Sequence, residues 1–138
     1  MADLTQAASA ITVNEDRILF VRSKRTREKW AFPGGKREEG ENVQSTAKRE
    51  TKEEVGLDIE LTHDLGKYVI AYPFGGFEIR CFAAVSRKAD LKLDDDEILE
   101  ARWATIEEGR KLDLTTTARD ALEKFASLPD SFPLAGED

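Results

Sequence analysis

Runs of β-branched and aliphatic residues alternate with polar turns in the first part of the chain. Two such runs are Ser9–Val13 and Arg17–Ser23, and the polar triplet Asn14–Asp16 between them has the length of a turn between antiparallel strands. We therefore predict a β-hairpin. Residues 24–42 are rich in charged residues, glycine and proline. Their apolar residues follow neither the two-residue period of a strand nor the 3.6-residue period of a helix, which indicates a loop around a short strand, Trp30–Phe32.

A helical pattern replaces the loop pattern at residue 43. Asn42 is a good N-cap, the next thirteen residues contain no glycine or proline, and Gly56 stands where helices commonly end in a left-handed residue. We predict a helix over 43–55, of about three and a half turns. One i, i+4 row of small and apolar residues marks its buried face: Val43, Ala47, Thr51 and Val55.

Strands and helices continue to alternate in the second half of the chain. No internal repeat, low-complexity tract or linker divides the sequence, so we expect a single domain over residues 1–128 and a flexible tail over residues 129–138. The element order predicts an α/β protein, an α+β sandwich in which helices flank a mixed β-sheet. The predicted elements are strand 59–72, turn 73–76, strand 77–86, an acidic connection over 89–100, strand 100–106, a helical turn over 105–112 and helix 115–128.

The composition excludes several classes of protein. The chain has 138 residues and a net charge of -7, which argues against a nucleic-acid partner, since such binding relies on neutralised phosphates. Cys81 is the only cysteine, so neither an internal disulfide nor a thiolate zinc site can form. Residues 1–13 lack the pattern of an export signal, and no apolar run approaches ~20 residues. We expect a soluble, cytoplasmic protein with no membrane association.

Glutamates of the predicted helix form an acidic group. Glu50, Glu53 and Glu54 fall within an arc of about 100° beside the buried row, and Glu50 and Glu54 are like-charged i, i+4 neighbours. Such a pair costs roughly 0.2–0.5 kcal/mol in an isolated helix. Either these acids are simply solvated, or they hold a cation. Carboxylates are hard ligands that suit Mg²⁺, Mn²⁺ or Ca²⁺, and the loaded site would attract a phosphate ester or anhydride.

The segment Gly35–Leu57 resembles the Nudix box, the 23-residue signature of the Nudix hydrolases, and the preceding Trp30–Gly35 segment also fits that family. The departure is Thr51, where the family usually has a large aliphatic residue; we expect it to cost some packing and to remove no ligand. The remaining signature positions match in type and spacing: Gly35, Glu41, Arg49, Glu50, Glu53, Glu54, Gly56 and Leu57.

The resemblance implies a Nudix-type fold and hydrolysis of a nucleoside diphosphate linked to a moiety X, with Mg²⁺ or, alternatively, Mn²⁺ as cofactor. It implies Glu50 and Glu54 as the best metal ligands and Glu53 as a ligand or as the base that activates water. The Gly35 carbonyl is implied as a further ligand. Arg49 is expected to orient a carboxylate rather than to contact substrate, and Glu41 to brace the loop or support the ligands.

Acidic and basic residues outside the signature are further candidates. In the acidic run Asp94–Glu97, Glu97 matches a place where the family often supplies an additional base or metal ligand; Glu100 is its competitor, and a solvated acidic turn is the alternative. The basic run Arg22–Lys29 is a local exception to the negative charge of the chain. Its residues Arg22 and Arg25 are candidates to attract substrate phosphates, and we favour Arg22, which directly follows a predicted strand core; solvated loop charge explains the run equally well.

Aromatic residues near the turn at 73–76 are candidates for substrate binding. Tyr72 and Phe74, together with Phe77, are placed to stack on a base or a ribose, although aromatics in strands more often belong to the core. Pro73 follows Leu57 by sixteen residues, a spacing that resembles the ADP-ribose-hydrolysing branch of the family, although turns recruit proline in any case.

We therefore favour ADP-ribose or a related nucleotide sugar as substrate. The alternatives are a pyrophosphohydrolase of damaged or ordinary nucleoside triphosphates and a Nudix module that binds a nucleotide without catalysis. The intact acidic group argues against the latter. We expect a nucleotide as the small-molecule partner of a monomer or a homodimer.

Overall fold

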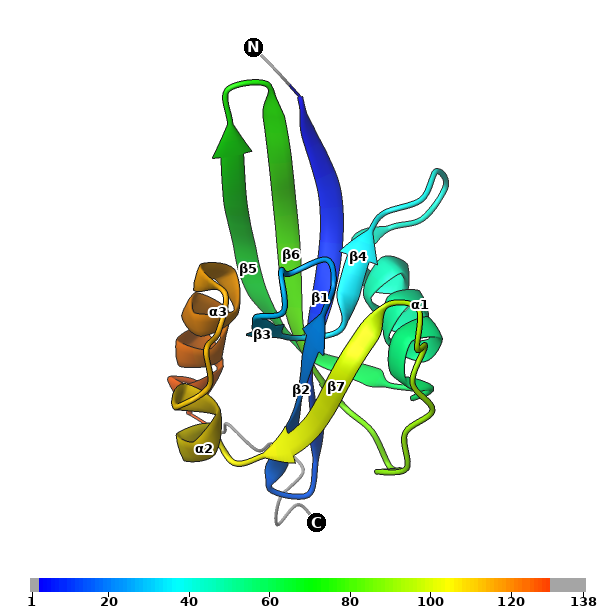
Figure 1. The fold of residues 1–138 in the computed structure, drawn as a ribbon, viewed down its shortest axis with the longest axis vertical. Helices are drawn as coiled ribbons and strands as arrows, with labels where there is room; N and C mark the ends of the chain where they lie inside the picture. The colour runs from blue at the N-terminus through cyan, green and yellow to red at the C-terminus, as the bar shows by residue number, and fades with distance from the viewer. Residues whose placement is uncertain (1–2, 130–138) are drawn as a thin grey trace.

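One long strand, β1, forms the centre of the fold in the computed structural model, which describes residues 3–129. β6 runs parallel to β1 over its whole length, and β5 pairs antiparallel with β6 at the edge of the sheet (Figure 1). On its other side β1 pairs with β4 and with β2, and β2 pairs with β3 and β7. The strands are β1 (Leu4–Asn14), β2 (Arg17–Ser23), β3 (Trp30–Ala31), β4 (Gly34–Lys36), β5 (Glu60–Tyr72), β6 (Gly75–Val85) and β7 (Ile98–Ala104).

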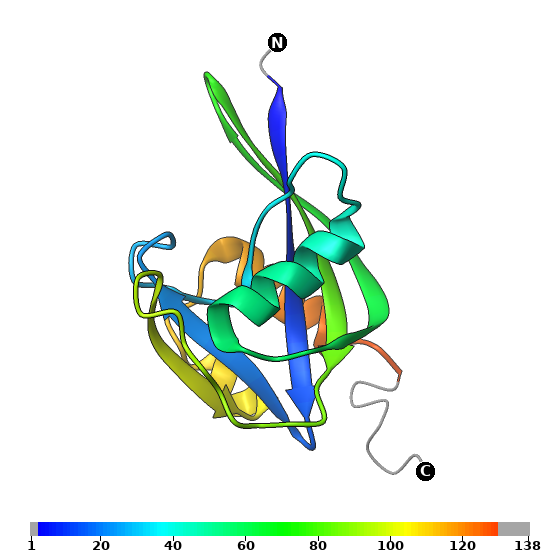
Figure 2. The ribbon, with the colours of Figure 1, turned by 90° about the vertical axis from the view of Figure 1, so that its right-hand side faces the viewer.

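Helices cover both faces of this mixed sheet. α1 lies on one face, and α2 and α3 lie on the other (Figures 1 and 2). The alternation of side chains along β2 shows the same two layers, since Phe20 joins the core under α3 and Leu19 joins the core under α1. The predicted α+β sandwich is therefore confirmed. The helices are α1 (Val43–Val55), α2 (Ile106–Arg110) and α3 (Thr116–Ala126).

The predicted hairpin and the bounds of the first helix are confirmed. β1 and β2 pair through Val13 with Ile18, around a turn in which Glu15 has φ 56°. Asn42 Oδ1 accepts a hydrogen bond from the Ser45 amide at 2.8 Å, and Gly56 ends the helix with φ 80°. The helix position and direction therefore follow from local capping.

The prediction placed the start of β1 wrongly and did not include β4. β1 begins at Leu4 rather than Ser9, because the alanine- and polar-rich stretch before Ser9 pairs along β6 and β4. β4 was predicted as loop, since a glycine-rich segment has little strand propensity of its own. The Cβ position of Gly34 lies 2.4 Å from the Ala8 carbonyl oxygen, so only glycine allows this close pairing.

Thr51, the departure from the Nudix signature, is completely buried in α1. Its hydroxyl donates to the Ala47 carbonyl at 2.8 Å, within the helix. A buried polar group that has its hydrogen bond avoids most of the desolvation cost. Thr51 is therefore accommodated as a small core residue.

No helix within residues 3–129 is both long and apolar enough to cross a bilayer. The tail predicted over 129–138 lies, apart from residue 129, outside the described residues.

Candidate functional site

Arg49 is the centre of a hydrogen-bonded network on α1. Its Nε donates to Glu41 Oε2 at 2.6 Å, and its Nη1 donates to Glu50 and Glu53 at 3.0 and 3.1 Å. Nη2 reaches the Lys36 carbonyl at 3.0 Å, so the guanidinium also ties the helix to β4. The hydrogen bond from Arg49 lowers the pKa of Glu41 to about 2, and the same bond raises the pKa of Arg49. Arg49 thus holds three carboxylates by hydrogen bonds, and Glu41 joins α1 to the loop before it through Arg49 and the Glu38 amide.

Glu54 is a carboxylic acid buried beside a second one. It is 4% exposed and its Oε1 accepts the Gly34 amide at 3.2 Å. Burial raises its pKa to about 8; the nearby Arg25 opposes that rise, and Glu50 adds to it by charge and by a hydrogen bond. A Cβ atom on Gly35 would lie 2.5 Å from the Glu50 carboxylate, so glycine is required for this approach.

Glu50 and Glu54 fit a hard divalent cation. Two carboxylates beside the Gly35 backbone form an oxygen-rich donor set, and Mg²⁺ is commonly held by one or two carboxylates together with waters and substrate phosphates. The side chain of Glu53 is instead 56% exposed and bound to Arg49. Across residues 3–129, no three His, Cys, Asp or Glu side chains are gathered closely enough to hold one metal ion.

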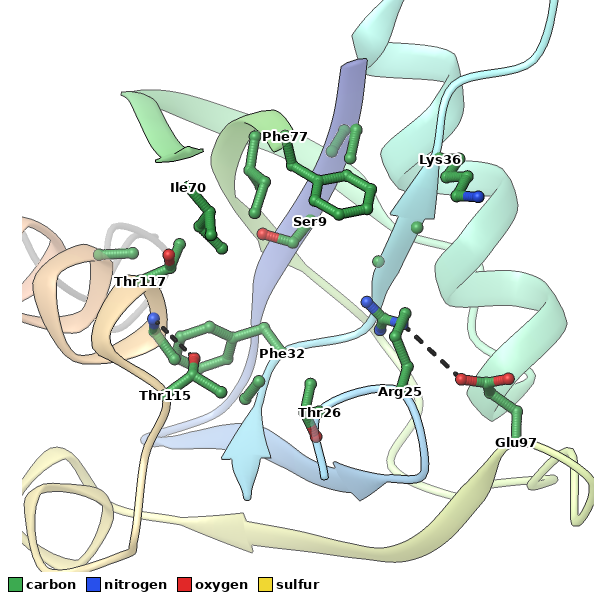
Figure 3. Close-up of a pocket in the computed structure, with 18 of the residues that line it drawn as sticks. Ser9, Arg25, Thr26, Phe32, Lys36, Ile70, Phe77, Glu97, Thr115 and Thr117 are labelled. Atoms are coloured by element: carbon green, nitrogen blue, oxygen red, sulfur yellow. Dashed lines mark hydrogen bonds and ion pairs between the residues drawn. The ribbon is translucent and has the colours of Figure 1, made fainter. Parts of the chain in front are cut away.

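A cavity of about 590 Å³ opens beside this acidic group (Figure 3). Its apolar wall comes from the sheet, from Phe32 after β3 and from alanines of α3, and its hydroxyl groups come mainly from β1 and from the beginning of α3. Arg25, Lys36 and Glu97 contribute charge, and the backbone of Gly35 joins the cavity to the carboxylates. The volume is in the range of small-molecule sites. The larger lining side chains are Phe32, Ile70, Tyr72, Phe77 and Ile79, and the hydroxyl residues are Ser9, Thr26, Thr115 and Thr117.

The structure separates the charged candidates outside the signature. Arg25 and Glu97 both line the cavity and form an ion pair at 3.7 Å (Figure 3). Glu100 instead pairs with Arg22 at 3.3 Å. Arg22 also pairs with Glu28 and is not among the residues that line the cavity, so its position gives no support to a substrate-binding role. Arg22 still belongs to β2, whereas Arg25 lies in the loop that follows this strand.

The aromatic candidates are separated in the same way. Tyr72 and Phe77 line the cavity. Phe74 is 83% exposed at the tip of the β5–β6 hairpin, where it stacks on Tyr72 with ring centroids 5.9 Å apart, and it is not part of the cavity wall. The prediction of Phe74 as a substrate-binding residue therefore has no support from its position.

Sequence reasoning missed two groups of lining residues. Phe32 belongs to the segment before the signature, and its neighbouring glycines were the available signal. Thr115 and Thr117 were recognised only as caps of the last helix, and Thr115 does accept the Ala118 amide at 3.1 Å. Their place in the cavity depends on how α3 packs against the sheet.

Comparison with known proteins agrees with this geometry. A NUDIX domain model matches residues 3–125. Nudix hydrolase 4 of Arabidopsis thaliana is 32% identical over 101 residues, which are 70% of this chain and 48% of that protein, so the chain spans about half the length of this curated relative.

Solved structures share the fold. The MutT protein from Methanosarcina mazei Go1 has 25% identity and a TM-score of 0.78, covering 91% of this chain and 94% of that one. A C. elegans Ap4A hydrolase has 19% identity and a TM-score of 0.79, covering 90% and 96%. With the signature on α1, the family model and these neighbours in agreement, the chain belongs to the Nudix family.

Proposed function

We propose that this protein is a metal-dependent Nudix hydrolase that cleaves the diphosphate linkage of a nucleoside diphosphate joined to a moiety X. The observation that carries this proposal is the buried Glu54 beside Glu50, at the edge of a cavity large enough for a nucleotide. Without a cation, two adjacent carboxyl groups at that depth cannot both ionise cheaply. Divalent metal binding is the function that uses them.

Glu50, Glu54 and the Gly35 carbonyl would hold Mg²⁺, with Mn²⁺ as an alternative. The bound cation would neutralise the diphosphate and polarise its P–O bonds. Glu53 is proposed as the base that takes a proton from the attacking water, or as a further ligand after leaving Arg49. Glu97, which lines the cavity, is the second candidate base. The water oxygen bonds to phosphorus as the bridging P–O bond breaks, and the leaving phosphate takes up the remaining charge.

ADP-ribose or a related nucleotide sugar is the proposed substrate class. Aromatic and aliphatic side chains of the wall suit a base, and the hydroxyls of Ser9, Thr115 and Thr117 suit a sugar. The spacing of Pro73 favours the same class. A nucleoside triphosphate would use the same carboxylates and the same wall, so it remains the alternative substrate.

Incubation with Mg²⁺ and a nucleotide panel tests this proposal. We expect ADP-ribose to yield AMP and ribose 5-phosphate. Chromatography detects both products. Release of pyrophosphate from a triphosphate, with ADP-ribose intact, would favour the alternative substrate. If a nucleotide binds but no member of the panel is hydrolysed with Mg²⁺ or Mn²⁺, the protein is a non-catalytic nucleotide-binding module and the proposal is wrong.

A further inference from the structure

Arg25 lies between two carboxylates from different parts of the chain. Its Nη2 atom is 3.8 Å from Oε2 of the buried Glu54, and its Nε atom is 3.7 Å from Oε2 of Glu97 (Figure 3 shows the pair with Glu97). Both distances exceed those of N–H···O hydrogen bonds. Charge, rather than directed bonds, therefore holds the guanidinium between these two acids.

Backbone hydrogen bonds fix the segments that carry these side chains. The Lys24 amide donates to the Glu97 carbonyl at 3.2 Å, which joins the loop after β2 to the loop before β7. The Asp94 amide donates to the Glu54 carbonyl at 3.0 Å, which joins that second loop to the end of α1. The Arg25 side chain itself is 43% exposed, so it can leave the carboxylates while its backbone stays in place.

The position of Arg25 matters for metal binding. It places a positive charge against Glu54, one of the carboxylates assigned above to the metal. A divalent ion at Glu54 would lie close to this guanidinium and would be repelled by its positive charge. Removing the charge of Arg25 should therefore strengthen metal binding.

We propose that Arg25 is the internal counter-ion of the metal-free site. It places its single positive charge between Glu54 and Glu97 when no metal is bound, competes with the divalent ion, and becomes available to an anionic substrate once the metal has replaced it. Metal and substrate then favour each other's binding. Metal at Glu54 releases Arg25 for the substrate, and substrate that binds Arg25 releases Glu54 for the metal. This inference rests on the proposed function, because it requires a metal at Glu50 and Glu54.

Mn²⁺ binding, followed by the electron paramagnetic resonance signal of the free ion, tests the proposal without any turnover. We expect Arg25→Gln to bind Mn²⁺ about tenfold more tightly than the unaltered protein. The Mn²⁺ affinity of Arg25→Lys should lie between these two values, because lysine keeps the positive charge but its ammonium group cannot contact both carboxylates as the guanidinium does. Arg22→Gln is the matched control, because Arg22 also joins two carboxylates but lies outside the cavity, and its Mn²⁺ affinity should not change.

Thermal unfolding gives a second readout. In EDTA, Arg25→Gln should unfold at a lower temperature than the unaltered protein, and saturating Mn²⁺ should reduce that difference. A site in which Arg25 only contacts substrate would show neither effect.

The outcomes separate this inference from the proposed function. If the unaltered protein binds Mn²⁺ and Arg25→Gln binds it equally or more weakly, the counter-ion role is wrong and the proposed function stands. If Mn²⁺ binds only after Arg25 is replaced, competition is stronger than expected and the inference is supported. If neither protein binds Mn²⁺, both proposals fail.

Discussion

The α1 side of the candidate site and its cavity side are held in different ways. On α1, Arg49 makes hydrogen bonds of 2.6–3.1 Å to three carboxylates and one carbonyl, all within residues 36–53. On the cavity side, Arg25 touches Glu54 and Glu97 only at 3.7–3.8 Å, and its partners come from distant parts of the chain. One arginine is a fixed brace, whereas the other is a replaceable counter-ion.

This difference shows how an acidic site remains folded without excluding its cation. Directed hydrogen bonds from Arg49 hold Glu41 and Glu50 in position, and the positive charge of Arg49 offsets part of their negative charge. Because Arg49 already occupies one oxygen of Glu50, a guanidinium bound equally firmly to Glu54 would leave few free carboxylate oxygens for the metal. The looser contact of Arg25 with Glu54 can still be exchanged for a metal ion.

The largest expected effect concerns the buried carboxyl. Replacing Glu54 by Gln keeps the acceptor for the Gly34 amide but removes the charge that would hold the metal. We expect turnover to fall by about 10²–10⁴-fold, measured with the best substrate of the panel. The exposed Glu39 gives a control, since Glu39→Gln should keep nearly full activity. Near-normal turnover in Glu54→Gln would remove this carboxylate from the mechanism.

A smaller effect is expected from the fixed arginine. Arg49→Lys loses the planar fork, so turnover should fall by about 10–100-fold and the free energy of unfolding by about 1–3 kcal/mol. Arg110→Lys is the control, because Arg110 also binds two carboxylates, on α2 and α3. Equal losses in both variants would mean that Arg49 has only a structural role.

The two ends of the aromatic segment give a test of the cavity side. Phe77→Ala removes part of the wall and should raise KM about tenfold, in line with the contribution of aromatic stacking. Phe74→Ala should change KM by less than about twofold, because its ring lies outside the wall. The reverse order of effects would place the substrate on the hairpin tip.

The last prediction concerns the stability of the metal-free protein, which should depend on pH, rather than turnover or KM. Burial raises the pKa of Glu54 from 4.5 to about 8, so the folded state binds a proton that the unfolded state has released. Stability should therefore fall as pH rises from about 4.5 to about 8, by at most ~1.4 kcal/mol per pH unit. Urea unfolding in EDTA should show this slope, and Glu54→Gln should lack it. Parallel profiles would show that Glu54 ionises at its ordinary pKa.

Local signals predicted the α1 side well. Asn42 and Gly56 gave the bounds of the helix, and the spacing of the acids gave the family. The cavity side was predicted only in part, because Glu97 was separated from Glu100, and Arg25 from Arg22, by the packing of loops rather than by any residue pattern. Phe32 and Thr117 were missed for the same reason.

The sequence by itself determined the helix, its acidic face and the membership of the Nudix family, because capping and i, i+4 spacing act over one segment of chain. Only the tertiary structure decided that Glu54 is buried, that Glu53 turns to Arg49, and that Arg25 reaches both Glu54 and Glu97. Burial and charge pairing depend on what lies nearby in space. Those neighbours come from strands and loops far apart in the chain.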